Sequence, residues 1–504
     1  SKVGAGVGRD LRTKVFNKVV NFSDAEINKF STASLITRTT NDVQQVQMVT
    51  VMLLRMVLYA PIMAVGGIIM VIRTGAGMGY IIAIAVVAIA VLMILLMAFA
   101  MPKFKIMQKL VDKVNLVSRE ILTGIPVIRA FSREKHEEKR FDDANKELTG
   151  VMLYTNRVMT FMMPALMIIM NVMSILIVWT SAHRIDAGVM EVGTMTAFIT
   201  YTMMIVMAFL MLTMISIMLP RAGVAADRID EVLKTEVSVN NSTDAVDAGR
   251  SKGVVRFNHV SFAYPEAEGK VLDDIDFEAS PGTTTAIIGS TGCGKSTLVN
   301  LIPRFFDVTE GSITLDGRDI RNITLESLRE NIGYVPQKGI LFSGTIADNI
   351  KYGQLVESDE DMLEAAEIAQ ATEFIEAKPD KYESQVAQGG NNVSGGQKQR
   401  LSIARAIARD PMIYIFDDSF SALDFKTDAA LRKALAPKVK DKTVLIVAQR
   451  ISTVMHAEQI IVLDDGKVAG IGTHKELMEN CEIYRQIAGS QLSESELKKS
   501  LEVK

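Results

Sequence analysis

The residues with the clearest chemical pattern form a glycine-rich run, Gly289-Ser-Thr-Gly-Cys-Gly-Lys-Ser-Thr297, which matches GxxxxGK[ST] in full. In this pattern the glycines allow backbone N–H groups to surround phosphate oxygens, and the helix that follows adds positive potential at its N-terminus. We expect Lys295 to reach the outer phosphates and the Ser296 hydroxyl to bind Mg²⁺. An apolar strand at 285–288 before the run and a helical pattern from Leu298 after it complete the context that the motif requires. The predicted phosphate-binding residues are Gly289, Ser290, Thr291, Gly292, Cys293, Gly294, Lys295, Ser296 and Thr297.

A carboxylate that could share this metal ion follows much later in the chain, at the end of the apolar run Met412–Asp417. A buried strand that ends in aspartate is how phosphate-loop enzymes place a metal-binding carboxylate beside the phosphates. The alternative is a strand-terminal aspartate that only caps the next turn. We predict that Asp417 binds the metal ion together with Ser296.

A third motif, Val393-Ser-Gly-Gly-Gln-Lys-Gln-Arg400, lies between these two. Ser-Gly-Gly-Gln before a basic helix is the signature of ATP-binding-cassette (ABC) proteins, and the chain closely resembles the exporter class of that family. The resemblance implies an all-α transmembrane domain followed by an α/β phosphate-loop ABC ATPase domain, with ATP and Mg²⁺ as cofactors. It also implies that two motor domains pair head to tail, each ATP lying between one domain's phosphate loop and the other's signature. The signature residues are Ser394, Gly395, Gly396 and Gln397.

Further positions match the family's pattern in order along the chain. By this resemblance, Tyr264 stacks on adenine, Gln337 contacts Mg²⁺ and couples to the membrane domain, and Ser421–Asp424 crosses to the second motor domain. In the first half of the chain, Gly124–Phe131 resembles the second coupling region and Ser34–Asp42 the stretch around the first. The resemblance therefore covers essentially the whole chain.

Two catalytic positions depart from the family's pattern. The metal-binding aspartate is usually followed by a glutamate that acts as general base, whereas here Asp417 is followed by Asp418. Aspartate is shorter by one carbon–carbon bond, about 1.5 Å, and a general base must lie within hydrogen-bond reach of its proton. The switch histidine is replaced by Gln449, which can hydrogen-bond the γ-phosphate but carries no positive charge. Both catalytic changes predict slow hydrolysis of the ATP held by this chain's own phosphate loop.

The signature, in contrast, is intact. Two smaller departures lie next to it: Val393 stands where leucine is usual, and Gln385–Gly390 lacks the usual acidic residue. This combination resembles the degenerate-site subunit of heterodimeric bacterial multidrug exporters. We therefore expect the partner to be a second ABC half-exporter, a different chain with Glu and His at the two catalytic positions. We also predict that bound ATP protects Cys293 from thiol-alkylating reagents, unless this cysteine is merely small and buried.

Other functions fit parts of this pattern. A homodimeric lipid or peptide exporter would share the domain order, and an ATP-binding regulatory subunit that does not pump would share the altered catalytic positions. An importer is disfavoured because importers of this family usually keep the two domains on separate chains. A nucleotide-gated channel is disfavoured because no regulatory insertion separates the domains. The 29 methionines fit either simple apolar filling or a pliable wall for apolar and amphipathic substrates, which we expect this protein to export.

The first half of the chain must supply the membrane-spanning elements. Four apolar stretches, 51–72, 80–100, 158–182 and 194–220, have the length of about 20 residues that a bilayer requires. Basic residues are concentrated before the first stretch and between the second and third, which the positive-inside rule places in the cytosol. We therefore expect a multi-pass protein of the cell membrane with its ATPase domain in the cytoplasm. The basic connector is predicted to be helical on either side of Gly124–Pro126.

The expected domain order follows from these patterns. A transmembrane domain at 1–229 is followed by a linker at 230–252, a nucleotide-binding domain at 253–490 and a C-terminal tail at 491–504. Polar and turn-forming residues mark the linker. Family members usually have six spanning helices, so we expect that two helices are missing before residue 1, with a natural four-helix version as the alternative.

Composition limits the partners. The 504 residues carry a net charge of −3, which gives no reason to expect nucleic acid among them. The expected partners are the second half-exporter, the lipid bilayer and an apolar small-molecule substrate. The two cysteines, Cys293 and Cys481, are far apart and imply neither a disulfide framework nor a metal site.

Overall fold

The computed structural model describes residues 2–74, 77–265, 267–493 and 496–497. The chain divides into two compact units, which we call the helical unit and the α/β unit. The helical unit comprises the chain up to Val15 and Thr37–Leu233, and the α/β unit comprises Phe16–Ile36 and the chain from Lys234 onward. Most of the predicted tail at 491–504 lies outside the described residues.

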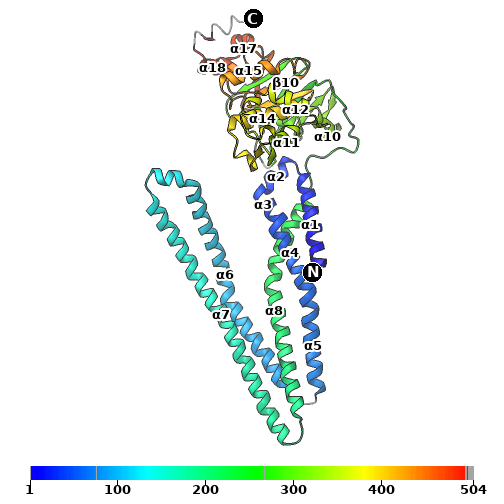
Figure 1. Ribbon diagram of the computed structural model, residues 1–504, viewed down its shortest axis with the longest axis vertical. Helices are drawn as coiled ribbons and strands as arrows, with labels where there is room; N and C mark the ends of the chain where they lie inside the picture. Colours follow the sequence, from blue (N-terminus) through cyan, green and yellow to red (C-terminus); the bar gives the residue numbers. More distant parts are fainter. Residues whose placement is uncertain (1, 75–76, 266, 494–495, 498–504) are drawn as a thin grey trace. The chain divides into compact units, whose positions relative to one another are not determined.

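Long helices make up the helical unit (Figure 1). Four helices of the described chain are long and apolar enough to cross a membrane, which is the number predicted from the sequence. The first of them is a continuous helical path in which two π-helical turns join three α-helical segments. Two helices cross the boundary between the units near the start of the chain, since Phe16–Val20 of α1 and Thr32–Ile36 of α3 are assigned to the α/β unit. The helical elements up to α8 are α1 (Lys2–Val20), α3 (Thr32–Thr37), η1 (Arg38–Asp42), α4 (Val43–Met52), η2 (Leu53–Val57), α5 (Leu58–Arg73), α6 (Gly79–Ala130), α7 (Glu134–Asp186) and α8 (Val192–Lys234).

Much of the apolar surface of these helices is not covered by the chain itself. In the most apolar window of each candidate span, no more than 29% of the residues are buried. Large side chains such as Ile62, Ile94 and Trp179 are exposed. Such surfaces are stable against lipid or other membrane helices, because the helix satisfies its own backbone groups and the bilayer core accepts apolar side chains.

The turn between α6 and α7 lies further along the chain than the sequence predicts. We expected the helix to break at Gly124–Pro126, but α6 continues through both residues to Ala130. Proline removes only one backbone donor, so a long helix can accommodate it. The chain reverses instead at Ser132, whose φ of +50° is left-handed, and the N–H of Arg133 bonds to the carbonyl of Ile128 at 2.9 Å. This is the hydrogen-bond pattern of a Schellman-type helix end.

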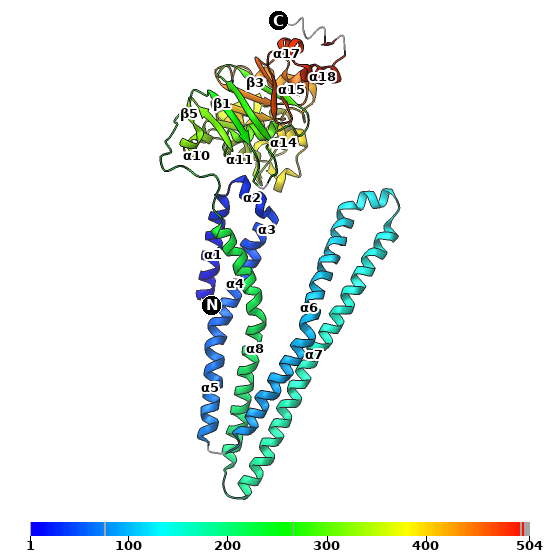
Figure 2. The same cartoon turned by 180° about the vertical axis from the view of Figure 1, so that it is seen from behind.

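Two main sheets form the core of the α/β unit (Figure 2). The larger has the strand order β12-β11-β3-β10-β9-β6, in which only β12 is antiparallel to its neighbour. The smaller sheet is antiparallel, with the order β2-β1-β4-β5, and β7 pairs with β8. The strands are β1 (Val255–Phe262), β2 (Leu272–Ala279), β3 (Thr284–Gly289), β4 (Glu310–Leu315), β5 (Arg318–Asp319), β6 (Ile332–Val335), β7 (Gly344–Thr345), β8 (Gln385–Val386), β9 (Ile413–Asp417), β10 (Thr443–Val447), β11 (Gln459–Asp464) and β12 (Lys467–Gly472).

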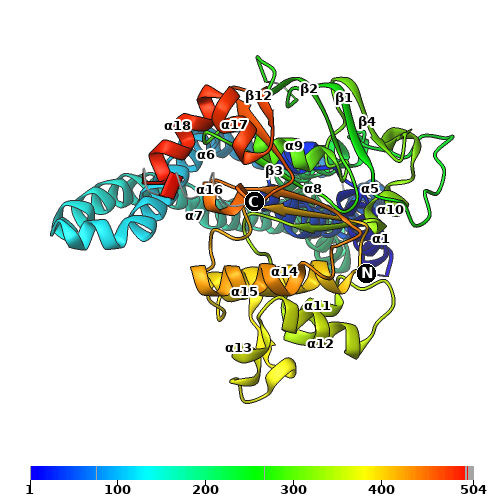
Figure 3. The same ribbon diagram turned by 90° about the horizontal axis from the view of Figure 1, so that it is seen from above.

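Helices pack around these sheets. Figure 3 shows α14 and α15 on one side of the larger sheet, and α11 and α12 pack against α14. The helices of the α/β unit are α2 (Asp24–Phe30), α9 (Lys295–Leu301), α10 (Leu325–Glu330), α11 (Ile346–Lys351), α12 (Asp359–Ile368), α13 (Thr372–Glu376), α14 (Gly395–Ala408), α15 (Phe425–Leu435), α16 (Ile451–Val454), α17 (His474–Asn480) and α18 (Glu482–Gln491). Short 3₁₀ turns are η3 (Ile320–Asn322), η4 (Lys381–Glu383) and η5 (Gln388–Gly390). The arrangement confirms the predicted fold class.

The larger sheet determines which chain segments meet. Every residue of β9 and of β10 is buried, as expected for parallel strands covered on both faces. Val447 at the end of β10 pairs with Asp417 on one side and with Ile287 on the other. The loops that follow β3, β9 and β10 therefore leave the sheet at the same edge, where ligands of open α/β sheets bind.

The segment predicted as a linker is attached along the α/β unit. The first part of the predicted stretch is still helical, since α8 ends at Lys234. Further on, the N–H of Val246 bonds to the carbonyl of Asn322 at 3.0 Å. The side chain of Asn331 then accepts from the N–H of Ser251 at 2.9 Å and donates to the carbonyl of Gly249 at 2.7 Å. These bonds hold the segment in a defined path.

Helix α2 belongs to the α/β unit although it lies near the start of the chain. The Glu26 carboxylate accepts hydrogen bonds from the N–H groups of Ser23 at 2.8 Å and Ser238 at 3.1 Å. Burial acts to raise the pKa of Glu26, but the hydrogen bonds from Ser23 and Ser238 together outweigh it and hold this pKa below its ordinary value. Glu26 thus ties α2 to the segment after α8.

Candidate nucleotide-binding site

The phosphate loop has the backbone conformation that its glycines predict. Gly292 and Gly294 have φ angles of +89° and +96°, in the left-handed region that other residues rarely adopt. A Cβ on Gly294 would also lie 2.8 Å from a side-chain carbon of Leu272. Helix α9 begins at Lys295, earlier than the apolar pattern from Leu298 suggested, because its first turn is made of polar loop residues.

Lys295 lies inside this loop. Its side chain is almost fully buried, and the ammonium donates to the carbonyl oxygens of Gly289 at 2.8 Å and Ser290 at 2.6 Å. The Sγ atom of buried Cys293 lies 3.7 Å from the same ammonium. The positive charge is therefore enclosed by the loop that the motif predicts as the phosphate cradle.

Ser296 and Asp417 meet across the sheet edge, as the sequence predicted from two distant motifs. The Ser296 hydroxyl donates to Oδ1 of Asp417 at 2.9 Å. Burial raises the pKa of Asp417, and the nearby Asp418 carboxylate adds to this effect, while Ser296 and Lys295 oppose it. The raised pKa means that a negative charge here is costly without a compensating cation.

Two glutamine side chains from separate segments meet at the carboxylate of Asp418. Its Oδ2 atom accepts hydrogen bonds from Nε2 of Gln449 at 2.8 Å and from Nε2 of Gln337 at 3.4 Å. The backbone of Asp418 has a φ of +47°, and its N–H bonds to the carbonyl of Val447 at 3.0 Å. Its carbonyl accepts from the Ser421 hydroxyl at 2.8 Å. Both departures from the family's pattern, Asp418 and Gln449, are therefore direct neighbours.

Tyr264 provides an aromatic ring beside the phosphate loop. Its hydroxyl lies 2.9 Å from Oγ1 of Thr297. The ring contacts Phe262 and Phe306 edge-on, with centroid distances of 4.9 Å and 5.2 Å. These contacts fix the ring in place, so that it can offer a face to a flat base.

One cavity of about 360 Å³ brings most of the predicted site together. Gly289, Ser290 and Cys293 belong to the same loop but do not line it. Val271 and Val447 also line it, and no chemical signal in the sequence marks these two valines. The lining residues are Tyr264, Val271, Thr291, Gly292, Gly294, Lys295, Ser296, Thr297, Gln337, Asp417, Asp418, Val447 and Gln449.

The signature residues do not line this cavity. Ser394 caps the N-terminus of α14, its hydroxyl accepts from the N–H of Gln397, and the Gln397 side chain accepts from the N–H of Ser394. Gly395 and Gly396 form the first turn of the same helix. This reciprocal capping box fixes the start of the helix and leaves the signature at the surface.

Sequence reasoning missed Gln399, two residues beyond the signature. Its buried side chain accepts from the N–H of Gly339 at 3.0 Å and donates to the carbonyl of Pro336 at 3.1 Å. It thereby attaches α14 to the segment that carries Gln337. A glutamine among the apolar residues of one helix face is the signal that could have pointed to it.

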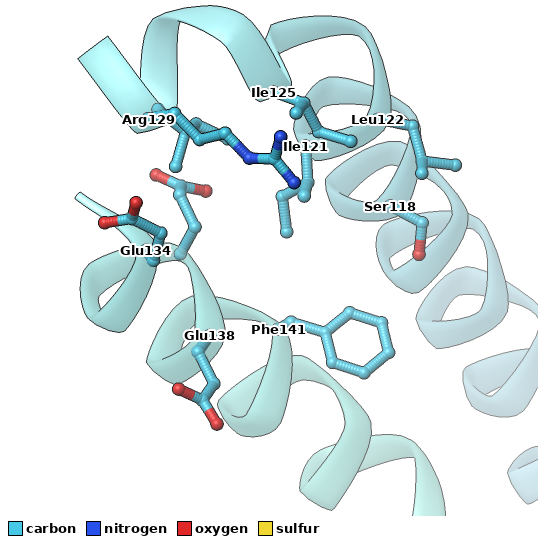
Figure 4. Close-up of a pocket in the computed structure, with 10 residues that line it drawn as sticks. Ser118, Ile121, Leu122, Ile125, Arg129, Glu134, Glu138 and Phe141 are labelled. Carbon is cyan, nitrogen blue, oxygen red and sulfur yellow. The ribbon is translucent and has the colours of Figure 1, made fainter. Parts of the chain in front are cut away.

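A second cavity, of about 490 Å³, lies between α6 and α7 near the turn that joins them (Figure 4). Ile121 and Ile125 of α6 face Phe141 of α7 across it. Arg129 and Glu134 lie at its polar end. The cavity includes part of Gly124–Phe131, the stretch that resembles a coupling region.

The fold and the site together define a membrane-spanning phosphate-loop ATPase. Two family models match the chain: the ABC transporter transmembrane region at residues 1–209 and the ABC transporter model at 272–421. An uncharacterized ABC transporter ATP-binding protein of Mycobacterium tuberculosis is 44% identical over 500 residues, covering 97% of this chain and 85% of the relative. The chain belongs to the ABC transporter family, as an exporter half-transporter and transport ATPase of the membrane with a cytoplasmic ATPase domain.

Two further comparisons concern exporters. A putative multidrug export ATP-binding/permease protein of Bacillus subtilis is 37% identical over 73% of this chain and 63% of its own length. The structure of a bacterial Atm1-family ABC exporter with ATP bound superposes with a TM-score of 0.80 and 26% identity. The match covers 98% of this chain and 86% of that one. This chain therefore has the Atm1-family exporter fold, and its ATPase domain binds ATP.

Proposed function

We propose that this chain is the slowly hydrolysing subunit of a heterodimeric exporter. Its own phosphate loop binds ATP that is hydrolysed slowly, and its intact signature serves the competent site of a different half-exporter. The observation that carries the proposal is the contact between Asp418 and Gln449, the two altered catalytic positions, beside an intact phosphate loop.

The residues for binding Mg·ATP are present and suited to it. Ser296 and Asp417 offer hydroxyl and carboxylate oxygens, and Gln337 adds an amide oxygen, which is the ligand type that Mg²⁺ prefers. A bound Mg²⁺ would neutralise phosphate charge and relieve the buried charge of Asp417. Tyr264 would stack on adenine, and Lys295 would turn from its loop carbonyls to the outer phosphates.

The residues for hydrolysis are less suited. The Asp418 carboxylate is shorter than glutamate by about 1.5 Å, so it reaches less far toward an attacking water. One of its oxygens already accepts hydrogen bonds from two amides, so fewer of its acceptor positions are free for the hydrogens of an attacking water. Gln449 is neutral and cannot supply positive charge to the transition state. Slow turnover with retained binding follows from these three properties.

The transport cycle then rests on two states. ATP joins this chain's phosphate loop to the partner's signature. The two stretches that resemble coupling regions, Ser34–Asp42 and Gly124–Phe131, carry the closure to the membrane helices. Hydrolysis at the partner's site releases the closure, while slow turnover here keeps the motor domains partly joined. A substrate shifts this balance only through its different affinity for the two states.

The substrates we propose are apolar or amphipathic compounds. The multidrug export name of the Bacillus subtilis relative supports this class. So does the lining of the small cavity between α7 and α8, where methionines such as Met170, Met173 and Met203 are mixed with aliphatic residues. Methionine adapts its shape to varied apolar neighbours.

The test restores the family's residues. Asp418→Glu and Gln449→His together are expected to raise hydrolysis at this site by roughly tenfold or more, since general-base catalysis contributes about 10²–10⁴-fold. ATPase turnover would be measured in lipid nanodiscs with a partner whose own base is inactivated. Asp441→Glu with Gln486→His, at exposed positions outside the cavity, is the matched control.

Two results would contradict the proposal. One is brisk turnover of the unaltered chain as a homodimer, which would favour a homodimeric lipid or peptide exporter. The other is unchanged turnover in the restored double variant. A chain that binds ATP but moves no substrate into vesicles with any partner would instead be a regulatory subunit.

A further inference from the structure

Gln491, the last residue of α18, contacts the switch segment 448–451. Its Nε2 atom donates to the carbonyl of Gln449 at 2.8 Å, and its Oε1 atom accepts from the N–H of Ile451 at 2.8 Å. The side-chain amide of Gln491 therefore bonds to the carbonyl of Gln449 and to the N–H of Ile451, two residues further along. A backbone residue of a neighbouring parallel strand makes the same pair of hydrogen bonds.

The rest of the switch segment is attached to the core on either side of this contact. The N–H of Ala448 bonds to the carbonyl of Ile287 at 3.1 Å, and the side chain of Ile451 is fully buried. Ile451 also begins the four-residue helix α16, whose first N–H groups have no partner within the helix. Gln491 satisfies one of these donors and fixes the carbonyl between the two anchored ends.

Helix α18, which carries Gln491, is held in place by its packing. Tyr484 and Ala488 on its inner face are fully buried. The Tyr484 hydroxyl lies 2.7 Å from Nδ1 of His474 on α17. Because α18 cannot shift without opening this packing, the position of Gln491 relative to the sheet is defined.

We propose that Gln491 is a positioning residue of the nucleotide site. It holds the backbone of Gln449 so that one amide hydrogen of that side chain reaches Asp418 and the other serves the terminal phosphate of bound ATP. A glutamine side chain loses rotamer freedom when it is held in one place, and a backbone that is already fixed reduces the freedom that Gln449 still has to lose. The inference rests on the proposed role of Gln449 in the slow site.

The test compares ATP with ADP, because only ATP has the terminal phosphate. Affinities of the full chain in lipid nanodiscs would be measured by competition against fluorescent mant-ATP with Mg²⁺. In Gln491→Ala, ATP affinity is expected to fall about three- to tenfold, the range of one hydrogen bond. ADP affinity is expected to stay unchanged, because the contacts of Tyr264 and Lys295 are untouched, and this also reports that the variant is folded.

Two further variants show whether Gln491 acts through Gln449. In a Gln449→Ala background, Gln491→Ala is expected to cause no additional loss, since contributions along one path are not additive. Gln491→Glu keeps the acceptor for Ile451 but loses the donor to Gln449, so its ATP affinity is expected to fall as in Gln491→Ala. Gln486→Ala, on the exposed side of the same helix, is the matched control and should equal the unaltered chain.

Three outcomes would overturn the inference: an unchanged preference for ATP in Gln491→Ala, an equal loss for ATP and ADP, or a full effect in the absence of the Gln449 side chain. These binding measurements need no turnover and no partner. The slow-site proposal is judged separately, by the turnover of the Asp418→Glu and Gln449→His variant.

Discussion

The phosphate-binding half of the cavity and its hydrolytic half are built in different ways. The first uses a continuous loop, Gly289–Thr297, and relies on backbone groups, with Asp417 as its main contribution from elsewhere. The second consists of Gln337, Asp418 and Gln449, which follow three different strands and meet only through their side chains. The first half keeps the family's pattern, and the second departs from it at Asp418 and Gln449.

This difference shows how binding and hydrolysis can separate. A phosphate site made of backbone N–H groups depends on glycine conformations that few other residues can adopt. Replacing one such glycine changes the path of the loop, so phosphate binding by the whole loop is affected at once. A cluster of side chains can change one residue at a time without altering the fold. The following experiments test this contrast, from the largest expected effect to the smallest.

Lys295→Ala should abolish most of the binding on the phosphate side. The loss of a charge-assisted contact corresponds to roughly a 10- to 100-fold weaker ATP affinity. Mant-ATP titration of the chain in nanodiscs measures it. Asp418→Asn, on the hydrolytic side, should bind ATP nearly as well as the unaltered chain. A similar loss of ATP affinity in both variants would contradict the separation of the binding half from the hydrolytic half. Lys440→Ala, outside the cavity, is the control.

Ser394→Ala and Ser394→Asp should both slow the partner's ATP turnover, by roughly tenfold. The expected reason is that alanine lacks the signature hydroxyl, whereas aspartate brings a negative charge toward phosphate. Only alanine should also destabilise the α/β unit, by about 1 kcal/mol, because it removes the N-cap of α14 whereas aspartate preserves it. ATPase assays of the heterodimer and thermal unfolding separate the two effects. Mant-ATP binding to this chain's own loop should not change, and a change would show that the signature acts within its own chain.

ATP should slow the reaction of Cys293 with N-ethylmaleimide at least severalfold. The thiol is buried in the loop beside the Lys295 ammonium, so a nucleotide that occupies the loop excludes the reagent. Mass spectrometry of both cysteines gives an internal control, because Cys481 is equally buried but distant from the loop. Equal labelling of Cys293 with and without Mg·ATP would contradict the prediction.

Glu26→Gln should affect neither half of the cavity. At neutral pH the variant is expected to lower the stability of the α/β unit by about 1 kcal/mol, because charged acceptors form the stronger hydrogen bonds. The pKa of Glu26 is lowered in the folded chain, so its stabilisation is complete above the unfolded value of about 4.3 and is lost as the pH falls through the folded pKa. Thermal unfolding of both proteins from pH 7 downward measures this, with Glu268→Gln as the exposed control. A stability difference between the two proteins that grows toward acidic pH would contradict the prediction. A weaker ATP affinity in Glu26→Gln would contradict the expectation that Glu26 affects neither half of the cavity.

The sequence predicted the parts of the site that local pattern controls. The phosphate loop, the strand that ends at Asp417 and the helix after Ser394 all follow from spacing and residue type, because each forms within one short segment. It misplaced the turn at Gly124–Pro126, since helix breakers are tolerated where the helix continues to pack, and it began α9 too late. It gave no indication that α2 or the segment before Ser251 would be held by the α/β unit.

By itself, then, the sequence determined the family, the membrane spans and the identity of the chemical groups, including the two altered residues Asp418 and Gln449. Only the tertiary structure decided that these two residues are hydrogen-bonded to one another, that Gln399 holds the segment of Gln337 and that Gln491 holds the backbone of Gln449. The physical reason is that the order of strands in a parallel sheet brings together loops that are distant along the chain. Side-chain hydrogen bonds between such loops leave no periodic signal in the sequence.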